Sequence, residues 1–103
     1  MGVRGFDRIP VLIDVQIKYL DSVYTGTLIN LSERGMFIRI NKMPTLMDSD
    51  IEVILHLKGE EVHISGRPVR KANIRGLYEG IGVQLVDPPK SYLDFLDGLL
   101  AVL

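Results

Sequence analysis

The chain has 103 residues, of which 47% are hydrophobic and 24% are charged, and its formal net charge at pH 7 is −1. These values predict one globular domain with a sizeable core, and they exclude a general electrostatic attraction to nucleic acid or to anionic lipid. The absence of cysteine excludes disulfides and a thiol nucleophile, and the absence of a signal-peptide or membrane-length apolar run predicts a cytoplasmic protein without membrane insertion.

An alternation of apolar and polar residues predicts β-strands along most of the chain up to Pro88. It is clearest in VLIDVQIKYL, which begins at Val11, where the apolar side chains share one face and the polar side chains share the other. Closing six short antiparallel strands into a barrel removes their exposed edges. We therefore expect a mainly β fold, a six-stranded antiparallel β-barrel, with a first strand from residue 11 and further strands at 23–29, 36–40, 51–57, 62–69 and 80–86.

Three local signals refine this strand assignment. Lys58 and Gly59 predict a tight hairpin between the fourth and fifth strands. Pro68 has no N–H to donate to a ladder, so it predicts an edge position or a bulge in the fifth strand. The glycines of GIGVQLV, which begins at Gly80, predict a bend or a close approach of the backbone in the last strand.

After Pro88 and Pro89 the apolar period lengthens to that of a helix, with Ser91 as the expected N-cap and Asp94 three residues later. We expect this helix to pack on its own barrel, although a contact with a second subunit is also possible, so a monomer and a homodimer both remain open. The expected apolar face consists of Tyr92, Phe95, Leu96, Leu99 and Leu103. The predicted organisation is a single domain, 1–103, with a mobile leader at 1–9, a barrel at 10–87 and a helix at 88–103.

Two short motifs contain residue types suited to phosphate and purine groups. Arg4 and Arg8 precede the first strand at R-x-x-x-R spacing, and the turn before the third strand contains N-x-S-x-x-G, formed by Asn30, Ser32 and Gly35. Each motif alone has an ordinary explanation, because leading arginines are usually solvated and turns favour Asn, Ser and Gly. The order of the two motifs within this strand pattern, followed by GIGVQLV and a terminal helix, resembles the PilZ domain family.

The resemblance covers nearly the whole chain and implies a PilZ-like β-barrel with a C-terminal helix, whose usual ligand is the bacterial second messenger cyclic di-GMP. It implies that Arg4 and Arg8 bind guanine edges or phosphates, and that Asn30 meets a guanine edge. It further implies that Ser32 donates to phosphate or braces the turn, and that Gly35 permits a close approach.

The resemblance implies a bacterial receptor and not an enzyme. The expected ligand is cyclic di-GMP, and no cofactor is expected. Ligand binding would fold the leader onto the barrel and switch an unidentified protein partner in motility, pilus, biofilm or exopolysaccharide control. Val3 stands where many members have a further arginine, which favours one ligand molecule per site. Arg70 lies near a position where some members have tryptophan, and both a solvated arginine and stacking on a base remain open.

Two alternative functions remain. A PilZ-type adaptor would bind protein partners without nucleotide, which the intact R-x-x-x-R motif disfavours. A nucleic-acid-binding barrel would use RPVRKANIR, residues 67–75, but the acidic total charge and the few aromatic residues lead us to expect no DNA or RNA partner.

Neither a metal site nor an enzyme is predicted from the sequence. His56 and His63 flank the predicted hairpin without evident further metal ligands. There is no catalytic triad or P-loop motif that would indicate an enzyme.

Overall fold

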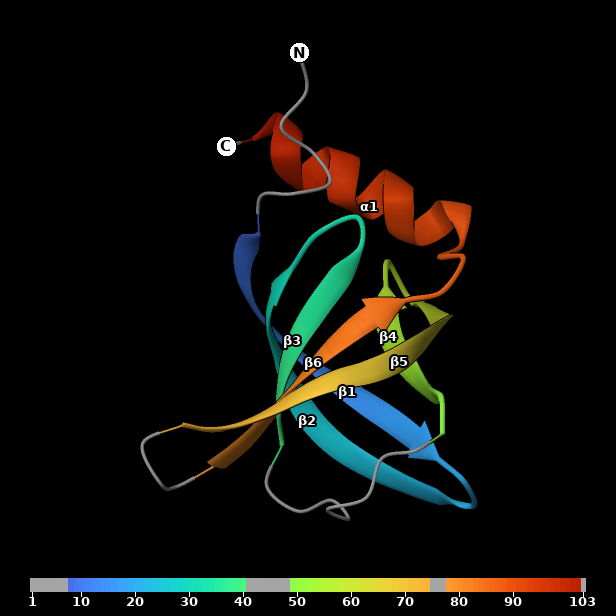
Figure 1. Cartoon of the computed structure of the whole chain (residues 1–103). Helices are drawn as coiled ribbons and strands as arrows, with labels where there is room; N and C mark the ends of the chain where they lie inside the picture. The colour runs from blue at the N-terminus through green and yellow to red at the C-terminus, as the bar shows by residue number, and fades with distance from the viewer. Residues whose placement is uncertain (1–7, 41–48, 75–77, 103) are drawn as a thin grey trace.

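The computed structural model describes residues 8–40, 49–74 and 78–102 (Figure 1). Neighbouring strands are antiparallel and close into a barrel in the order β1-β2-β3-β6-β5-β4, and α1 lies across one end of it (Figure 1). The predicted six-stranded barrel with a C-terminal helix is therefore confirmed. The elements are β1 (Ile9–Tyr19), β2 (Ser22–Leu31), β3 (Gly35–Ile40), β4 (Ile51–Leu57), β5 (Glu60–Ile74), β6 (Tyr78–Leu85) and α1 (Lys90–Ala101).

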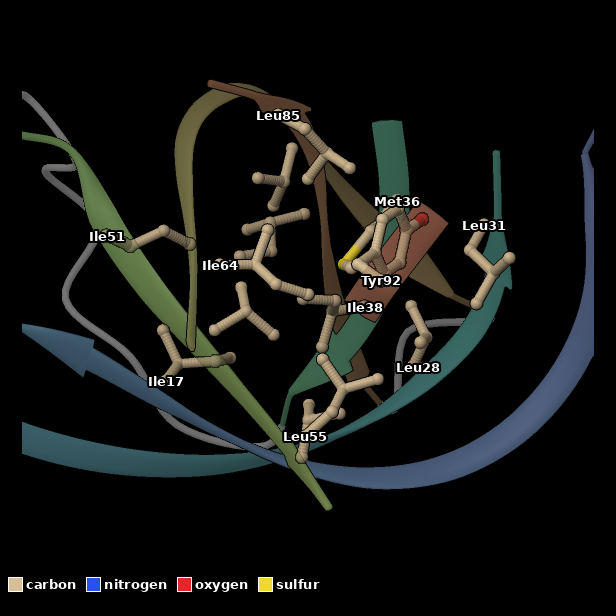
Figure 2. Close-up of a cluster of buried hydrophobic side chains, with 14 of the residues drawn as sticks. Ile17, Leu28, Leu31, Met36, Ile38, Ile51, Leu55, Ile64, Leu85 and Tyr92 are labelled. Atoms are coloured by element: carbon tan, nitrogen blue, oxygen red, sulfur yellow. The ribbon is translucent and has the colours of Figure 1, made fainter. Parts of the chain in front are cut away.

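The hydrophobic core fills the inside of the barrel, where side chains from several strands converge (Figure 2). On β1, Ile17 and Tyr19 are buried while Gln16 and Lys18 are exposed, as the alternating pattern predicted. α1 adds Tyr92 and its neighbour one turn later, Leu96, to the same core. The prediction that the helix packs on its own barrel is confirmed, and this packing brings the start of α1 close to the end of β2 and the start of β3 (Figure 2).

The predicted turn and bulge are both present. Lys58 and Gly59 have positive φ values of 53° and 82° and close the β4–β5 hairpin. The register of β5 against β6 shifts between Pro68 and Arg70, because proline cannot continue the ladder. Pairing resumes at Arg70, opposite Gly82, so β5 extends beyond the end predicted at residue 69.

The predicted N-cap of the helix is wrong. α1 begins at Lys90, its N-cap residue is Pro89, and no side chain caps it. Pro89 enters the helix from an extended backbone with ψ of 159°, so helical geometry starts before Ser91, and Asp94 instead pairs with the Lys90 ammonium group at 2.9 Å. Leu103 lies outside the described residues. Within these residues no helix has the length and apolar character needed to cross a membrane.

The packing of β2 against β3 generates a prediction about Gly26. A Cβ at this position would lie 2.7 Å from Ile40 Cγ2 and 2.9 Å from the Arg39 carbonyl oxygen, so we expect Gly26→Ala to lower the free energy of unfolding by about 1–3 kcal/mol. Gly98 in α1 is the control, because a Cβ there meets nothing within 4 Å, and Gly98→Ala should raise stability by about 0.5–1 kcal/mol. Urea denaturation measures both values, and equal stability of the two variants would contradict the packing.

Candidate ligand-binding site

The turn between β2 and β3, at residues 32–35, is held by its own hydrogen bonds. The Ser32 hydroxyl oxygen accepts from the backbone N–H of Gly35 at 3.2 Å and of Arg34 at 3.3 Å. The backbone N–H of Ser32 donates to the Gly35 carbonyl at 2.8 Å. Ser32 is only 4% exposed, so in this structure it braces the turn, which is one of the two roles implied by the PilZ resemblance.

Gly35 occupies a crowded position at the start of β3. A Cβ on this residue would lie 3.0 Å from the Val83 carbonyl oxygen and 3.1 Å from Arg8 Nη2. Both distances are shorter than an ordinary van der Waals contact, and Gly35 does not adopt a left-handed backbone. A Cβ here would force β6 or the Arg8 guanidinium to move by a few tenths of an ångström, so glycine permits their close approach.

Arg8 lies against this turn and also contacts β2. Its Nη1 donates to Asn30 Oδ1 at 2.9 Å, while its Nη2 faces Gly35. Because arginine has no acceptor, the amide oxygen of Asn30 must face it, and the Asn30 NH₂ group points elsewhere. The fold thus brings together four of the five predicted site residues. The fifth, Arg4, lies outside the described residues, together with the rest of the predicted leader before Arg8.

An open pocket of about 510 Å³ adjoins the 32–35 turn and the β5–β6 pair. Three of its lining residues are Arg8, Arg34 and Arg70, and among the described residues that line it there is no carboxylate. The described lining thus carries three guanidinium groups, although the net charge of the chain is −1. We call it the arginine pocket, and it is lined by Arg8, Ser32, Arg34, Gly35, Val69, Arg70, Gly82, Val83 and Gln84.

Two other concave regions of the described structure carry mixed charges. One, of about 560 Å³, has Asp14 and Arg39 among its lining residues on the outer face of the barrel. Another, of about 620 Å³ between α1 and the β4–β5 hairpin, includes Lys58 and Glu60. Neither concentrates charge of one sign, so the arginine pocket is the best fit for an anionic ligand.

The bulge in β5 determines what this strand contributes to the arginine pocket. Consecutive residues of a regular strand point to opposite faces, yet Val69 and Arg70 are both exposed and both line the pocket. The Arg70 side chain lies across Gly82, where a Cβ would be 3.7 Å from Arg70 Nε. The bulge therefore places an apolar side chain and a guanidinium next to each other on one wall.

Sequence reasoning missed part of this wall. It left Arg70 open between solvent and ligand, and it did not select Val69 or Arg34, both of which line the pocket. The signal for Val69 was present in the sequence, because Pro68 predicted a bulge and a bulge brings consecutive side chains to one face. Arg34 occupies a variable position of the N-x-S-x-x-G motif, where no residue type is required.

Tyr92 connects α1 to the inner side of the 32–35 turn. Its hydroxyl donates to the Ser32 carbonyl oxygen at 2.6 Å, and its side chain is fully buried. Burial, opposed in part by the positive charge of Arg8, raises the pKa of Tyr92 above its ordinary value. The hydroxyl thus remains a donor, and α1 bonds the turn from the core while the Arg8 guanidinium lies against Gly35 on the other side. Sequence reasoning had assigned Tyr92 only to an apolar helix face.

Comparison with known families agrees with this fold and with the order of the motifs. The sequence profile of the PilZ domain family matches residues 3–101. A search of curated protein sequences found no match.

Two solved structures show the same fold. The Bacillus subtilis inhibitor of motility MotI/DgrA has a TM-score of 0.76 and 14% sequence identity, and the match covers 98% of this chain and 51% of that chain. This chain therefore spans about half the length of MotI/DgrA. The PilZ domain of CeSA from a cellulose-synthesizing bacterium has a TM-score of 0.65 and 22% identity, and the match covers 93% of each chain.

The two histidines lie apart from the arginine pocket, on the β4–β5 hairpin. They are not directly opposite, because His63 pairs with Ile54 and His56 pairs with Glu61. The ring nitrogens of His63 lie 2.9 Å from Glu52 and 2.9 Å from Glu61, which forms a surface ion-pair cluster. The described ranges hold no group of three or more side chains arranged to bind a metal ion.

This cluster predicts a pH-dependent interaction. The hydrogen bonds to Glu61 and then to Glu52 raise the pKa of His63 above its ordinary value. Because the folded-state pKa is raised, the cluster stabilises the fold fully below the unfolded-state pKa of about 6.5, and this contribution is lost as pH rises through the folded-state pKa. We expect Glu61→Gln to lower the pKa of His63 in an NMR titration of the imidazole protons. An unchanged titration midpoint would show that Glu61 does not hold the ring.

Proposed function

Because the chain belongs to the PilZ domain family, a family of receptor and adaptor domains for cyclic di-GMP, we propose that it is a bacterial cyclic di-GMP receptor that acts on a protein partner. The observation that carries this proposal is the arginine pocket, where Arg8, Arg34 and Arg70 line a concave surface whose described lining includes no carboxylate. The function needs no catalytic chemistry, and we place it in the cytoplasm, where the second messenger is produced.

The chemistry of the ligand matches this pocket. Cyclic di-GMP carries two phosphate charges and two guanines, and each guanine has acceptors at N7 and O6 on one edge. Guanidinium groups donate in a planar fork that fits a phosphate or this guanine edge. Arg8 is already anchored by Asn30 and by its approach to Gly35, so less side-chain freedom is lost when it grips the ligand.

We assign a separate role to each remaining residue. Asn30 holds Arg8 with its amide oxygen and offers its NH₂ group to the N7/O6 acceptor edge of guanine. On the opposite guanine edge, which carries N–H donors, the same NH₂ group would face another donor. Val69 and Arg70 provide a surface on which a base can stack. Ser32 and Gly35 shape the wall beneath Arg8.

The leader before Arg8 completes the proposed site. Arg4 is four residues earlier in the R-x-x-x-R motif, and we propose that it closes over the ligand when the leader docks. Arg8 is not part of the segment that docks, since it already donates to Asn30 of β2 and lies against Gly35 of β3. Docking then changes the surface offered to a partner, for which motility and exopolysaccharide synthesis are the processes suggested by MotI/DgrA and the CeSA domain.

Calorimetric titration of the purified protein tests the proposed ligand. We expect cyclic di-GMP to bind with one molecule per site, because Val3 offers no extra cation for a second stacked molecule. GTP and cyclic di-AMP should bind far more weakly, since they lack either the second nucleotide or the guanine acceptor O6. Absence of cyclic di-GMP binding would overturn the receptor function and leave the nucleotide-independent adaptor.

Arginine variants test the site within the same assay. Arg8→Ala should weaken cyclic di-GMP binding by about 2 kcal/mol, or roughly 30-fold, because a charge-assisted contact is lost. Arg70→Ala should also weaken binding, whereas Arg67→Ala is the matched control. Arg67 is an exposed arginine of the same strand, pairs with Asp50 at 3.3 Å and does not line the pocket. Equal losses in all three variants would indicate a general charge effect instead of this site.

A further inference from the structure

The 32–35 turn is tied to the chain segment that leads into α1 at two separate points. At one end of the segment, the backbone N–H of Leu85 donates to the Arg34 carbonyl at 2.9 Å. At the other end, the Tyr92 hydroxyl donates to the Ser32 carbonyl at 2.6 Å. Two carbonyl groups of the turn thus face the end of β6 and the start of α1, while the Arg8 guanidinium lies against the glycine that ends the turn.

These contacts differ in what must break for each element to move. The strands of the barrel are paired on both sides, so shifting a strand breaks ladder hydrogen bonds. α1 satisfies its backbone internally and is attached to the barrel by side chains alone. Among its described residues Tyr92 and Leu96 are fully buried, and four further apolar side chains are partly buried against the core. The helix can therefore shift on the end of the barrel as a rigid body at lower cost than any strand.

We propose that Tyr92 is a positioning residue of the cyclic di-GMP site and the link through which the bound ligand changes the position of α1. This inference rests on the proposed function and adds the route by which the effect of ligand binding reaches α1. A ligand phosphate bound by Arg8 reorients its guanidinium, which packs against Gly35, so the 32–35 turn must adjust to it. Rotation of the peptide after Ser32 then redirects the carbonyl that Tyr92 bonds, and α1 follows its tyrosine.

The coupling acts in both directions, because linkage between two sites is reciprocal. If the ligand favours one position of α1, then a protein that binds α1 in that position raises the affinity for the ligand by the same factor. The 620 Å³ groove between α1 and the β4–β5 hairpin changes shape with any such shift, since Phe95 and Leu99 line it from the helix side. The surface of α1 is therefore where a partner senses the state of the arginine pocket.

The test compares Tyr92→Phe, which removes the hydroxyl and keeps the ring, with Tyr19→Phe as a matched control. Tyr19 is also buried in the core, at 6% exposure, but it pairs with Ser22 at the opposite end of the β1–β2 hairpin from the 32–35 turn. Calorimetry gives the affinity of each protein for cyclic di-GMP. Amide hydrogen exchange measured with and without cyclic di-GMP gives the response of α1 to the ligand.

In the wild-type protein and in Tyr19→Phe we expect cyclic di-GMP to change the exchange rates of α1 amides. In Tyr92→Phe this change should disappear, and affinity should fall by about three- to tenfold, the effect of losing one buried hydrogen bond. The difference between free and bound protein separates the two roles, because a purely structural weakening of α1 raises exchange in both states alike. Thermal melts confirm that each variant is folded.

Two results overturn the coupling while leaving the receptor function intact. One is wild-type protein that binds cyclic di-GMP without any change in α1 exchange, and the other is a Tyr92→Phe variant whose α1 responds as in the wild type. If the wild-type protein does not bind cyclic di-GMP at all, the proposed function fails and the coupling fails with it. The calorimetric arm distinguishes these cases.

Discussion

The buried hydrogen bonds of the 32–35 turn are the constraint on which the rest of the site depends. An unpaired buried polar group costs about 1–3 kcal/mol, so a turn whose serine hydroxyl and carbonyl are both bonded has few alternative arrangements. This fixed turn allows Arg8 to lie within close contact of Gly35 and to reach Asn30. The orientation of the guanidinium is thus set by groups whose own positions are determined by the barrel.

The pocket beside the turn arises from a defect in an otherwise regular ladder. A continuous β5–β6 pairing would turn every second side chain of β5 away from the site. The bulge after Pro68 instead leaves Val69 and Arg70 on the same face, and the buried Gly82 gives Arg70 a flat strand to cross. The two side chains therefore lie together on the pocket wall where the pairing shifts after Pro68, while the core beneath them stays closed.

The structural features that sequence patterns predicted correctly are those that depend only on neighbouring residues. The alternation of β1, the Lys58 turn and the break at Pro68 are local, and the structure confirms them. The N-cap prediction failed because Pro89, two residues before Ser91, is already the extended residue from which the helix begins. The bond from Tyr92 to Ser32 joins residues 60 positions apart, so a helical period can place Tyr92 on an inner face but cannot identify its partner.

A closed barrel gives a binding site rigidity but restricts how binding can be transmitted. Its strands are held on both sides, so energy released at the arginine pocket is not readily converted into strand movement. In the described part of the chain, Arg8 precedes the first strand, and α1 is attached to the barrel through side chains. Arg8 lies against one side of the 32–35 turn, and Tyr92 of α1 bonds it from the other. Because the 32–35 turn lies between Arg8 and α1, an effect of ligand binding at Arg8 can reach α1 through this turn.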